Sequence, residues 1–243
     1  MNTFKLVSCL GLLCGCLNAA SIVLPNAQTG SLGNDDSGPL SGFFSGSAIS
    51  QNIWAANQFS SVGGSLLITQ FAFRMKPGTG PINATATSFS FFMSTSPFSP
   101  STMTTTFATN RGADFTQVVS GTGTLWSSPG CAGPGVCPFD IIYTLTTPFL
   151  YNPSAGSLLI EQVLTGYNGV GSGRFDVQNY PSAIGATVGQ ISAFLPSPTG
   201  VLEYSDNVTR LTFTTVPEPG SSVLTMFGVG AFVFLRRRAS QFP

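Results

Sequence analysis

Short runs in which apolar and polar residues alternate recur through the middle of the chain, between segments rich in Gly, Pro, Asn and Ser. The clearest are residues 66–74, which end at a Lys-Pro-Gly turn, and residues 87–94. Alternation with a period of two is typical of strands with one buried face, and no segment of this region shows a convincing amphipathic-helix period. The runs predicted as strands are residues 53–59, 66–74, 87–94, 115–121, 139–147, 157–165, 186–195 and 210–216.

Strands of this length and spacing predict an all-β domain. The expected fold is a single β-sandwich with a jelly-roll-like topology, and the pattern alone does not order the strands. Apolar residues make up 42% of the chain and include 21 phenylalanines, which is enough to fill a core. The polar remainder is mainly Ser, Thr, Asn and Gly, and these residues favour strands and turns over helices.

The C-terminal residues follow a different pattern. Residues 220–235 carry no charge, and three consecutive arginines follow them. A helix over this span would rise about 24 Å at about 1.5 Å per residue, which is less than the membrane's hydrocarbon core of about 30 Å. Such a short transmembrane helix is a temporary anchor, and the arginines place its far end in the cytoplasm. The Pro-Glu-Pro tripeptide before it holds the backbone extended.

This three-part tail resembles the PEP-CTERM sorting signal of exported bacterial proteins. The residues that carry the resemblance are Pro217, Glu218 and Pro219, the apolar span, and Arg236, Arg237 and Arg238. In that family a membrane-embedded exosortase recognises the tail and removes it, typically in Gram-negative bacteria that make exopolysaccharide. The resemblance implies an exosortase as processing partner and transient anchoring in the inner membrane. It also implies a final place at the cell surface or in the extracellular matrix, with exopolysaccharide as a further partner. A plain C-terminal membrane anchor is the alternative.

The N-terminal residues agree with export. Residues 1–20 have one positive charge, Lys5, then an apolar stretch and small residues, which is typical of a secretory signal peptide. Cleavage is expected after Ala19 or Ala20. A competing interpretation is a lipoprotein box that ends at Cys16, the residue that would carry the lipid. The expected organisation is therefore a signal peptide over 1–20, a β-sandwich ectodomain over 21–215 and a sorting tail over 216–243.

The predicted ectodomain is mildly acidic and has few charges. Its positive residues are Arg74, Lys76, Arg111, Arg174 and Arg210, and its negative residues are Asp35, Asp36, Asp114, Asp140, Glu161, Asp176, Glu203 and Asp206. No basic surface is available to neutralise phosphates, which argues against nucleic-acid binding.

Two cysteines remain in this region, Cys131 and Cys137, in a segment rich in Gly and Pro. Their spacing and an oxidising compartment predict a local disulfide that staples a loop. A metal site is not expected, because the spacing is not that of a metal-binding pair and the chain has no histidine.

The absence of histidine also removes the usual general base and the catalytic triads that depend on it. No nucleophile elbow and no phosphate-binding loop is present. We therefore expect no enzymatic activity and no cofactor. Paired carboxylates could still hydrolyse glycosides, and Asp140 and Glu161 lie inside predicted strands where they could share a sheet face.

Carbohydrate binding by a lectin-like module is the main functional alternative. Sugars stack on exposed aromatic rings, and Trp126 and Tyr167 are the best candidates because Ser, Pro and Gly flank them. The same residue types are also common in sandwich cores. Residues 34–36 and 203–207 are oxygen-rich and could hold calcium, although solvated turns are the default interpretation. The sequence as a whole predicts an exported, non-enzymatic surface or matrix protein, with a lectin and a carboxylate hydrolase as alternatives.

Overall fold

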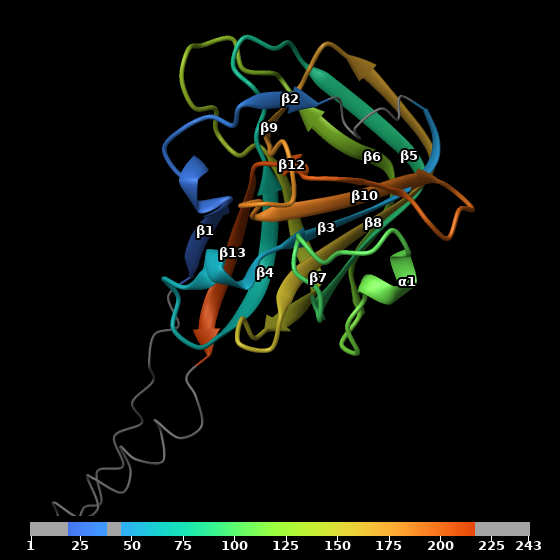
Figure 1. Cartoon of the computed structure of the whole chain (residues 1–243). Coiled ribbons are helices and arrows are strands. Elements are labelled where there is room, and N and C mark those ends of the chain that lie inside the picture. Colours follow the sequence, from blue (N-terminus) through green and yellow to red (C-terminus); the bar gives the residue numbers. More distant parts are fainter. Residues whose placement is uncertain (1–18, 38–44, 217–243) are drawn as a thin grey trace, which may run out of the picture.

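The computed structural model describes residues 19–37 and 45–216, and it is built almost entirely of antiparallel strands (Figure 1). The helical segments in this part of the chain are the short η1 (Asn26–Gln28), η2 (Ala56–Phe59) and α1 (Phe107–Asn110). The strands are β1 (Ala20–Leu24), β2 (Asp35–Ser37), β3 (Ser45–Trp54), β4 (Ser65–Phe73), β5 (Ile82–Ser96), β6 (Thr116–Ser128), β7 (Ile141–Tyr151), β8 (Ser157–Gly171), β9 (Phe175–Asn179), β10 (Val188–Phe194), β11 (Val201–Glu203), β12 (Ser205–Asn207) and β13 (Thr209–Val216).

Two sheets form the sandwich. One has the strand order β1-β13-β4-β7, and the other has the order β11-β10-β3-β8-β5-β6. When the eight strands β1, β3 to β8 and β13 are numbered in chain order, the two sheets read 1-8-3-6 and 2-7-4-5. This is the strand order of a jelly roll, with β10 and β11 added at one edge. The predicted all-β, jelly-roll-like fold is confirmed.

A third, small sheet covers the part of the six-stranded sheet that the narrower four-stranded sheet leaves open. Its strand order is β12-β9-β2, and we call it the cap sheet. β12 contacts β10, and the cap sheet lies at the end of the molecule away from the arrowhead of β13 (Figure 1). One part of the six-stranded sheet is therefore covered by the four-stranded sheet, and another part is covered by the cap sheet.

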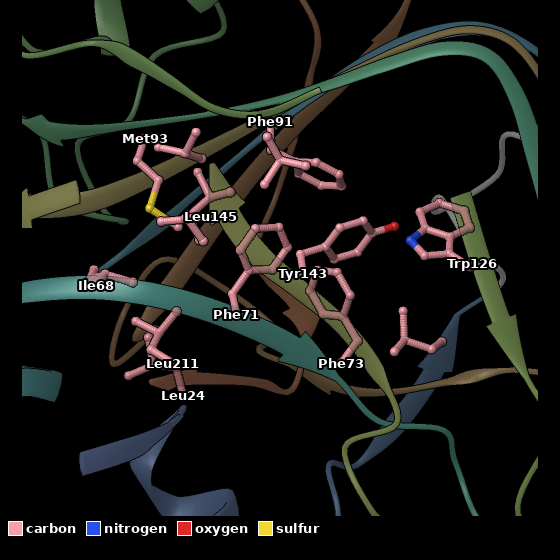
Figure 2. Close-up of a cluster of buried hydrophobic side chains, with 14 of the residues drawn as sticks. Leu24, Ile68, Phe71, Phe73, Phe91, Met93, Trp126, Tyr143, Leu145 and Leu211 are labelled. Atoms are coloured by element: carbon pink, nitrogen blue, oxygen red, sulfur yellow. The ribbon is translucent and has the colours of Figure 1, made fainter. Parts of the chain in front are cut away.

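The core between the two main sheets is aromatic, as Figure 2 shows. Phe71 of β4 stacks on Tyr143 of β7 with ring centroids 4.9 Å apart. Across the sandwich, Phe71 meets Phe91 of β5 edge to face at 5.0 Å. Alternate residues of β7 are buried and exposed, because a strand on an outer sheet has one solvated face.

A second apolar cluster lies on the opposite face of the six-stranded sheet, under the segment that contains α1. It is formed by Ile49, Ile53, Met103, Phe107, Leu159 and Ile191. β8 is thus covered on both faces, which explains why its first six residues are all buried. Burial of both faces therefore explains the apolar run over 157–165 that predicted this strand.

The predicted strand over 53–59 is wrong in its second half. β3 ends at Trp54, and η2 follows it. Gln58 turns the chain because its side-chain Oε1 accepts a hydrogen bond from the backbone N–H of Asn26 at 2.8 Å, and Asn26 Nδ2 donates to the Gln58 carbonyl at 2.6 Å. The other predicted runs all overlap strands.

None of the helices within 19–37 and 45–216 has the length and apolar character that crossing a bilayer requires. The predicted C-terminal helix lies outside the described residues.

Candidate functional site

The predicted sorting tail begins where the last strand ends. β13 ends at Val216, and its register places Ala20, at the start of β1, opposite Phe213. Because the two strands are antiparallel, Ala20 and Val216 lie at the same end of the sandwich (Figure 1). The predicted sorting residues themselves, Pro217, Glu218, Pro219, Arg236, Arg237 and Arg238, lie outside the described residues.

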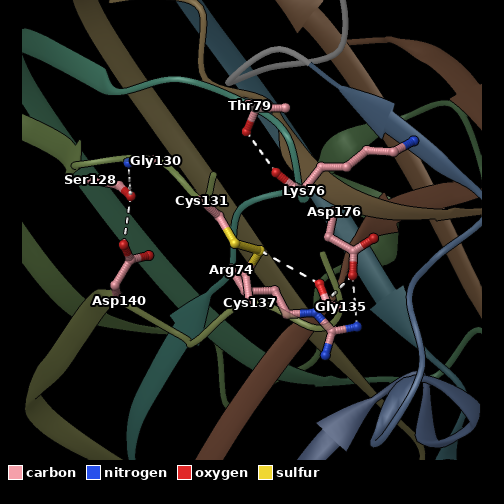
Figure 3. The surroundings of a disulfide bond; sticks show 10 residues. All are labelled: Arg74, Lys76, Thr79, Ser128, Gly130, Cys131, Gly135, Cys137, Asp140 and Asp176. Carbon is pink, nitrogen blue, oxygen red and sulfur yellow. Dashed lines mark hydrogen bonds and ion pairs between the residues drawn. A yellow bond between two sulfur atoms is a disulfide. The ribbon is translucent and has the colours of Figure 1, made fainter. Parts of the chain in front are cut away.

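The predicted disulfide between Cys131 and Cys137 is confirmed (Figure 3). The two Cα atoms are 6.1 Å apart. The backbone N–H of Cys131 donates to the carbonyl of Thr79 at 3.0 Å, and the N–H of Gly78 donates to the carbonyl of Cys131 at 2.7 Å. The disulfide therefore closes the loop between β6 and β7 on itself, and the backbone hydrogen bonds of Cys131 fasten this loop to the turn that precedes β5.

The two aromatic residues proposed to stack on sugars are buried. Trp126 is 2% exposed and Tyr167 is 3% exposed, and their rings pack edge to face with centroids 5.5 Å apart. Burial also raises the pKa of Tyr167 to about 12. The expectation that these rings offer open stacking faces is wrong, because the Ser and Gly residues around them belong to β6 and β8 rather than to exposed loops.

The carboxylates proposed as a hydrolytic pair do not share a sheet face. Asp140 precedes β7, whereas Glu161 lies in β8 of the six-stranded sheet. Ser128 Oγ donates to Asp140 Oδ2 at 2.5 Å. Arg111 holds Glu161 through two hydrogen bonds of 2.8 Å, and Gln51 Nε2 donates to the same carboxylate at 2.6 Å. The prediction of a shared face is wrong, and Glu161 is fully engaged in a structural network.

A second buried carboxylate, Asp176, is paired with Arg74, and both side chains are fully buried (Figure 3). Arg74 Nε donates to Asp176 Oδ2 at 2.7 Å. The guanidinium also donates to the carbonyls of Gln28 at 3.2 Å and Ser31 at 2.6 Å, and Asp176 Oδ1 accepts from the N–H of Gly33 at 2.9 Å. A buried ion pair is tolerated when its remaining hydrogen bonds are made, so this pair holds the segment between β1 and β2 against β9.

The segments considered for calcium, residues 34–36 and 203–207, contribute the two edges of the cap sheet on either side of β9. Lys76 Nζ lies 3.1 Å from Asp36 Oδ2, and Asn179 Nδ2 donates to Asp35 Oδ2 at 3.1 Å. In the part of the chain that the structure describes, no group of three or more His, Cys, Asp or Glu side chains could hold a metal ion.

A polar cavity lies between the cap sheet and the six-stranded sheet. Both tryptophans of the chain, Trp54 and Trp126, line it together with Phe73 and Phe91 at its apolar side. The space open to the centres of water-sized molecules is ≈ 30 Å³. One such position needs roughly 10–15 Å³, so the cavity has room for about two.

Buried polar atoms without a hydrogen-bond partner among the described residues belong to several of the residues that line this cavity. They are Asn52 Oδ1, Trp54 Nε1, Trp126 Nε1, Gln162 Nε2 and Asp206 Oδ2. Each buried polar group without a partner costs about 1–3 kcal/mol. The number of such residues around one cavity makes it the candidate binding site of the domain.

Asp206 is the only ionisable side chain among the described residues that line the cavity. Burial raises the pKa of its carboxyl well above the usual range, although the backbone N–H of Asn207, which donates to Oδ1 at 2.6 Å, opposes the shift. The carboxyl group therefore holds its proton to a higher pH than an exposed aspartate does.

Comparison with known families gives a match in the C-terminal tail. Residues 215–239 match the model of the PEP-CTERM protein-sorting motif. The chain carries a PEP-CTERM sorting motif. This match starts inside β13 and covers all six predicted sorting residues. A PEP-CTERM motif marks a protein that an exosortase sorts, so it implies export and processing at the membrane. No curated protein matches the chain.

The sequence interpretation identified the PEP-CTERM tail and missed the cavity. One signal for it was present: Ser50 and Asn52 alternate with Ile49 and Ile53 along β3, and Gln162 interrupts the apolar run of β8. Polar residues on one face of a strand usually indicate solvent. Here the cap sheet covers that face, and only the fold reveals it.

Proposed function

We propose that this protein is a non-enzymatic component of the cell surface or extracellular matrix. Its tail holds it at the inner membrane until an exosortase removes the tail near Pro217-Glu218-Pro219. The observation that carries the proposal is the PEP-CTERM match at residues 215–239, which begins in the last two residues of the final strand of the domain.

The position of β13 supports this order of events. Pro217 follows Val216 immediately, so the folded domain stands next to the segment that the exosortase recognises. Because proline fixes its own φ and disfavours helix in the residue before it, we expect Pro217 and Pro219 to oppose helix formation next to the strand. Ala20 lies at the same end, so the opposite end, with the cap sheet, faces away from the membrane while the tail is inserted.

The engagement of two buried carboxylates by arginine supports a role without catalysis. A general acid or base needs a carboxyl group that faces a reacting group and can exchange a proton with it. Glu161 and Asp176 are instead occupied by Arg111 and Arg74. The chain also has no histidine that could take over this role.

Mass spectrometry of C-terminal peptides from the producing cells tests the sorting step. We expect extracellular protein that ends near Pro217-Glu218-Pro219 and lacks residues 220–238. Replacement of the three motif residues by alanine should leave an uncleaved, membrane-bound form. Replacement of Ser240 and Gln241 by alanine, beyond the arginines, is the matched control and should leave processing unchanged.

Replacement of Arg236, Arg237 and Arg238 by neutral residues should cause unprocessed precursor to accumulate or pass through the membrane, because the arginines resist translocation. If peptides that end at Pro243 dominate in the extracellular fraction, the tail is not removed and the proposal fails.

A further inference from the structure

The cavity under the cap sheet lies at the end of the sandwich opposite the tail. Phe73, which lines it, pairs with Thr209 at the start of β13, whereas the tail follows Val216 at the end of that strand. Seven residues of strand correspond to about 23 Å at about 3.3 Å per residue. A ligand in the cavity would therefore be held on the side that points away from the membrane.

The unpartnered atoms form a mixed set of donors and acceptors. Trp54 Nε1 and Trp126 Nε1 are indole donors, Gln162 Nε2 is an amide donor and Asn52 Oδ1 accepts. Asp206 Oδ2 donates while the carboxyl group holds its proton, because Oδ1 already accepts from the N–H of Asn207. A hydroxyl group donates one hydrogen bond and accepts up to two. Two neighbouring hydroxyl groups can therefore donate to Asn52 Oδ1 and accept from the three N–H groups and the carboxyl O–H.

The charges around the cavity favour a neutral ligand. Among the described residues, no Lys or Arg lines it, so an anion would find no cation there. A metal cation would meet one carboxyl group, Asp206, and the positive ends of two indole N–H groups. A hydroxyl-bearing ligand fits this set without an unpaired charge, which the low dielectric of the interior would penalise.

The size and the edge of the cavity agree with this chemistry. The space of ≈ 30 Å³ accommodates about two water-sized positions, which is the requirement of two hydroxyl oxygens. Ser37, Ser205 and Asn207 line the cavity and are partly exposed, so the site reaches the surface at the cap sheet. The ring that carries the hydroxyl groups would rest at this rim.

We propose that the cavity binds two adjacent hydroxyl groups of a neutral sugar residue. The contacts are made by the side-chain N–H groups of both tryptophans rather than by stacking on their rings. This inference concerns the ectodomain alone, and it does not depend on removal of the tail by an exosortase.

Tryptophan fluorescence gives a direct readout, because the only two tryptophans of the chain both line the cavity. The full chain in detergent is titrated with the methyl glycosides of mannose, glucose and galactose, and with glucuronic acid as the anionic comparison. We expect a saturable change in emission with at least one neutral glycoside and none with glucuronic acid. Deoxy analogues that lack one hydroxyl of the bound pair should bind at least about tenfold more weakly.

The variant Gln162→Leu removes one donor while nearly keeping the side-chain volume, and it should weaken binding at least about tenfold. The matched control is Gln117→Leu on the solvent-exposed side of β6, which should bind as the parent does. Trp126→Phe keeps an aromatic ring without the N–H, and calorimetric titration of this variant should show a similar loss if the N–H makes the contact.

An unchanged melting temperature in these variants separates lost contacts from lost folding. The proposal is overturned if no neutral glycoside produces a saturable change up to about 100 mM, a limit well above the millimolar dissociation constants of weak binding. It is equally overturned if Gln162→Leu, properly folded, binds as tightly as Gln117→Leu. Either result leaves the sorting proposal intact, because that is tested by peptide masses.

Discussion

One face of the six-stranded sheet borders two different buried regions. Against the four-stranded sheet it packs Phe91 into a cluster with Phe71 and Tyr143, where each ring touches at least one other. Against the cap sheet the same face carries Asn52 and Gln162, whose Oδ1 and Nε2 atoms lie buried without a partner among the described residues. The first region is filled by side chains, and the second retains a cavity.

This difference shows that burial alone does not identify the structural core. In the aromatic region, close packing supplies the stabilising free energy of the fold. In the polar region, partnered and unpartnered groups lie side by side. The Arg74–Asp176 pair is fully bonded, whereas Asp206, on the neighbouring strand β12, has one carboxyl oxygen without a partner. Groups of the second kind need hydrogen-bond partners that the described residues do not supply.

The substitution Phe71→Ala tests the aromatic region most severely. Phe71 is completely buried, and loss of its ring should lower the free energy of unfolding by about 3–5 kcal/mol. Denaturant unfolding of the purified protein measures the change. Leu150→Ala, at a side chain that is 56% exposed on β7, is the control and should stay within about 0.5 kcal/mol of the parent. A loss below about 1 kcal/mol for Phe71→Ala would show that the cluster is not the core.

Removal of the disulfide tests how the end of the domain near the cap sheet is stabilised. Replacement of both Cys131 and Cys137 by alanine should lower the free energy of unfolding by about 2 kcal/mol, since a short loop constrains the unfolded chain only moderately. Hydrogen exchange should increase first around Thr79, which the Cys131 backbone contacts, and should change little at Phe71. Uniformly faster exchange across both regions would contradict this separation.

The variant Asp206→Asn should make the polar region less sensitive to pH. Burial raises the folded-state pKa of Asp206, so above the unfolded pKa of about 3.9 the unfolded state loses this proton while the folded state keeps it. The parent should therefore lose stability relative to the variant as pH rises from about 4, by at most about 1.4 kcal/mol per pH unit, until the folded-state pKa is passed. Unfolding curves of both proteins at pH 4, 6 and 8 measure this, and a constant difference would refute it.

The smallest change in the free energy of unfolding is expected for the variant Gln162→Leu. This change removes an amide whose nitrogen has no partner among the described residues and adds an apolar side chain of similar size. The free energy of unfolding should therefore stay within about 1 kcal/mol of the parent or rise. A loss as large as that of Phe71→Ala would mean that the two regions do not differ in kind.

Sequence patterns predicted the strands that keep the same face in the core along their length. The alternation in residues 66–74 and 139–147 predicted β4 and β7, because each has one face in the core and one in solvent. The prediction was wrong at Asp140 and at the end of residues 53–59, where hydrogen bonds to distant residues decide the local conformation. The strands β2, β11 and β12 have three residues each, too few to show a period.

The functional residues likewise fall into a group that the sequence predicted and a group that it did not. The tail was predictable because its three features are contiguous in the chain and act as a linear signal. The cavity combines β3, β6, β8 and β12, which are far apart in the sequence, so no local pattern contains it. The sequence neighbours of Trp126 predict an exposed sugar contact, whereas its burial depends on Tyr167 and Phe175, which lie in later strands.

The placement of β13 also has a mechanical consequence. This strand lies between β1 and β4, and the chain leaves the domain at its end, Val216. A pull on Val216 against anything held at the cap sheet acts along the length of the strand. The ladders to both neighbours then carry the load together in shear, because their hydrogen bonds run perpendicular to the strand. A force between Ala20 and Val216 would instead separate β1 from β13 one hydrogen bond at a time, so the domain resists tension along the axis from tail to cap far better than tension between its own two ends.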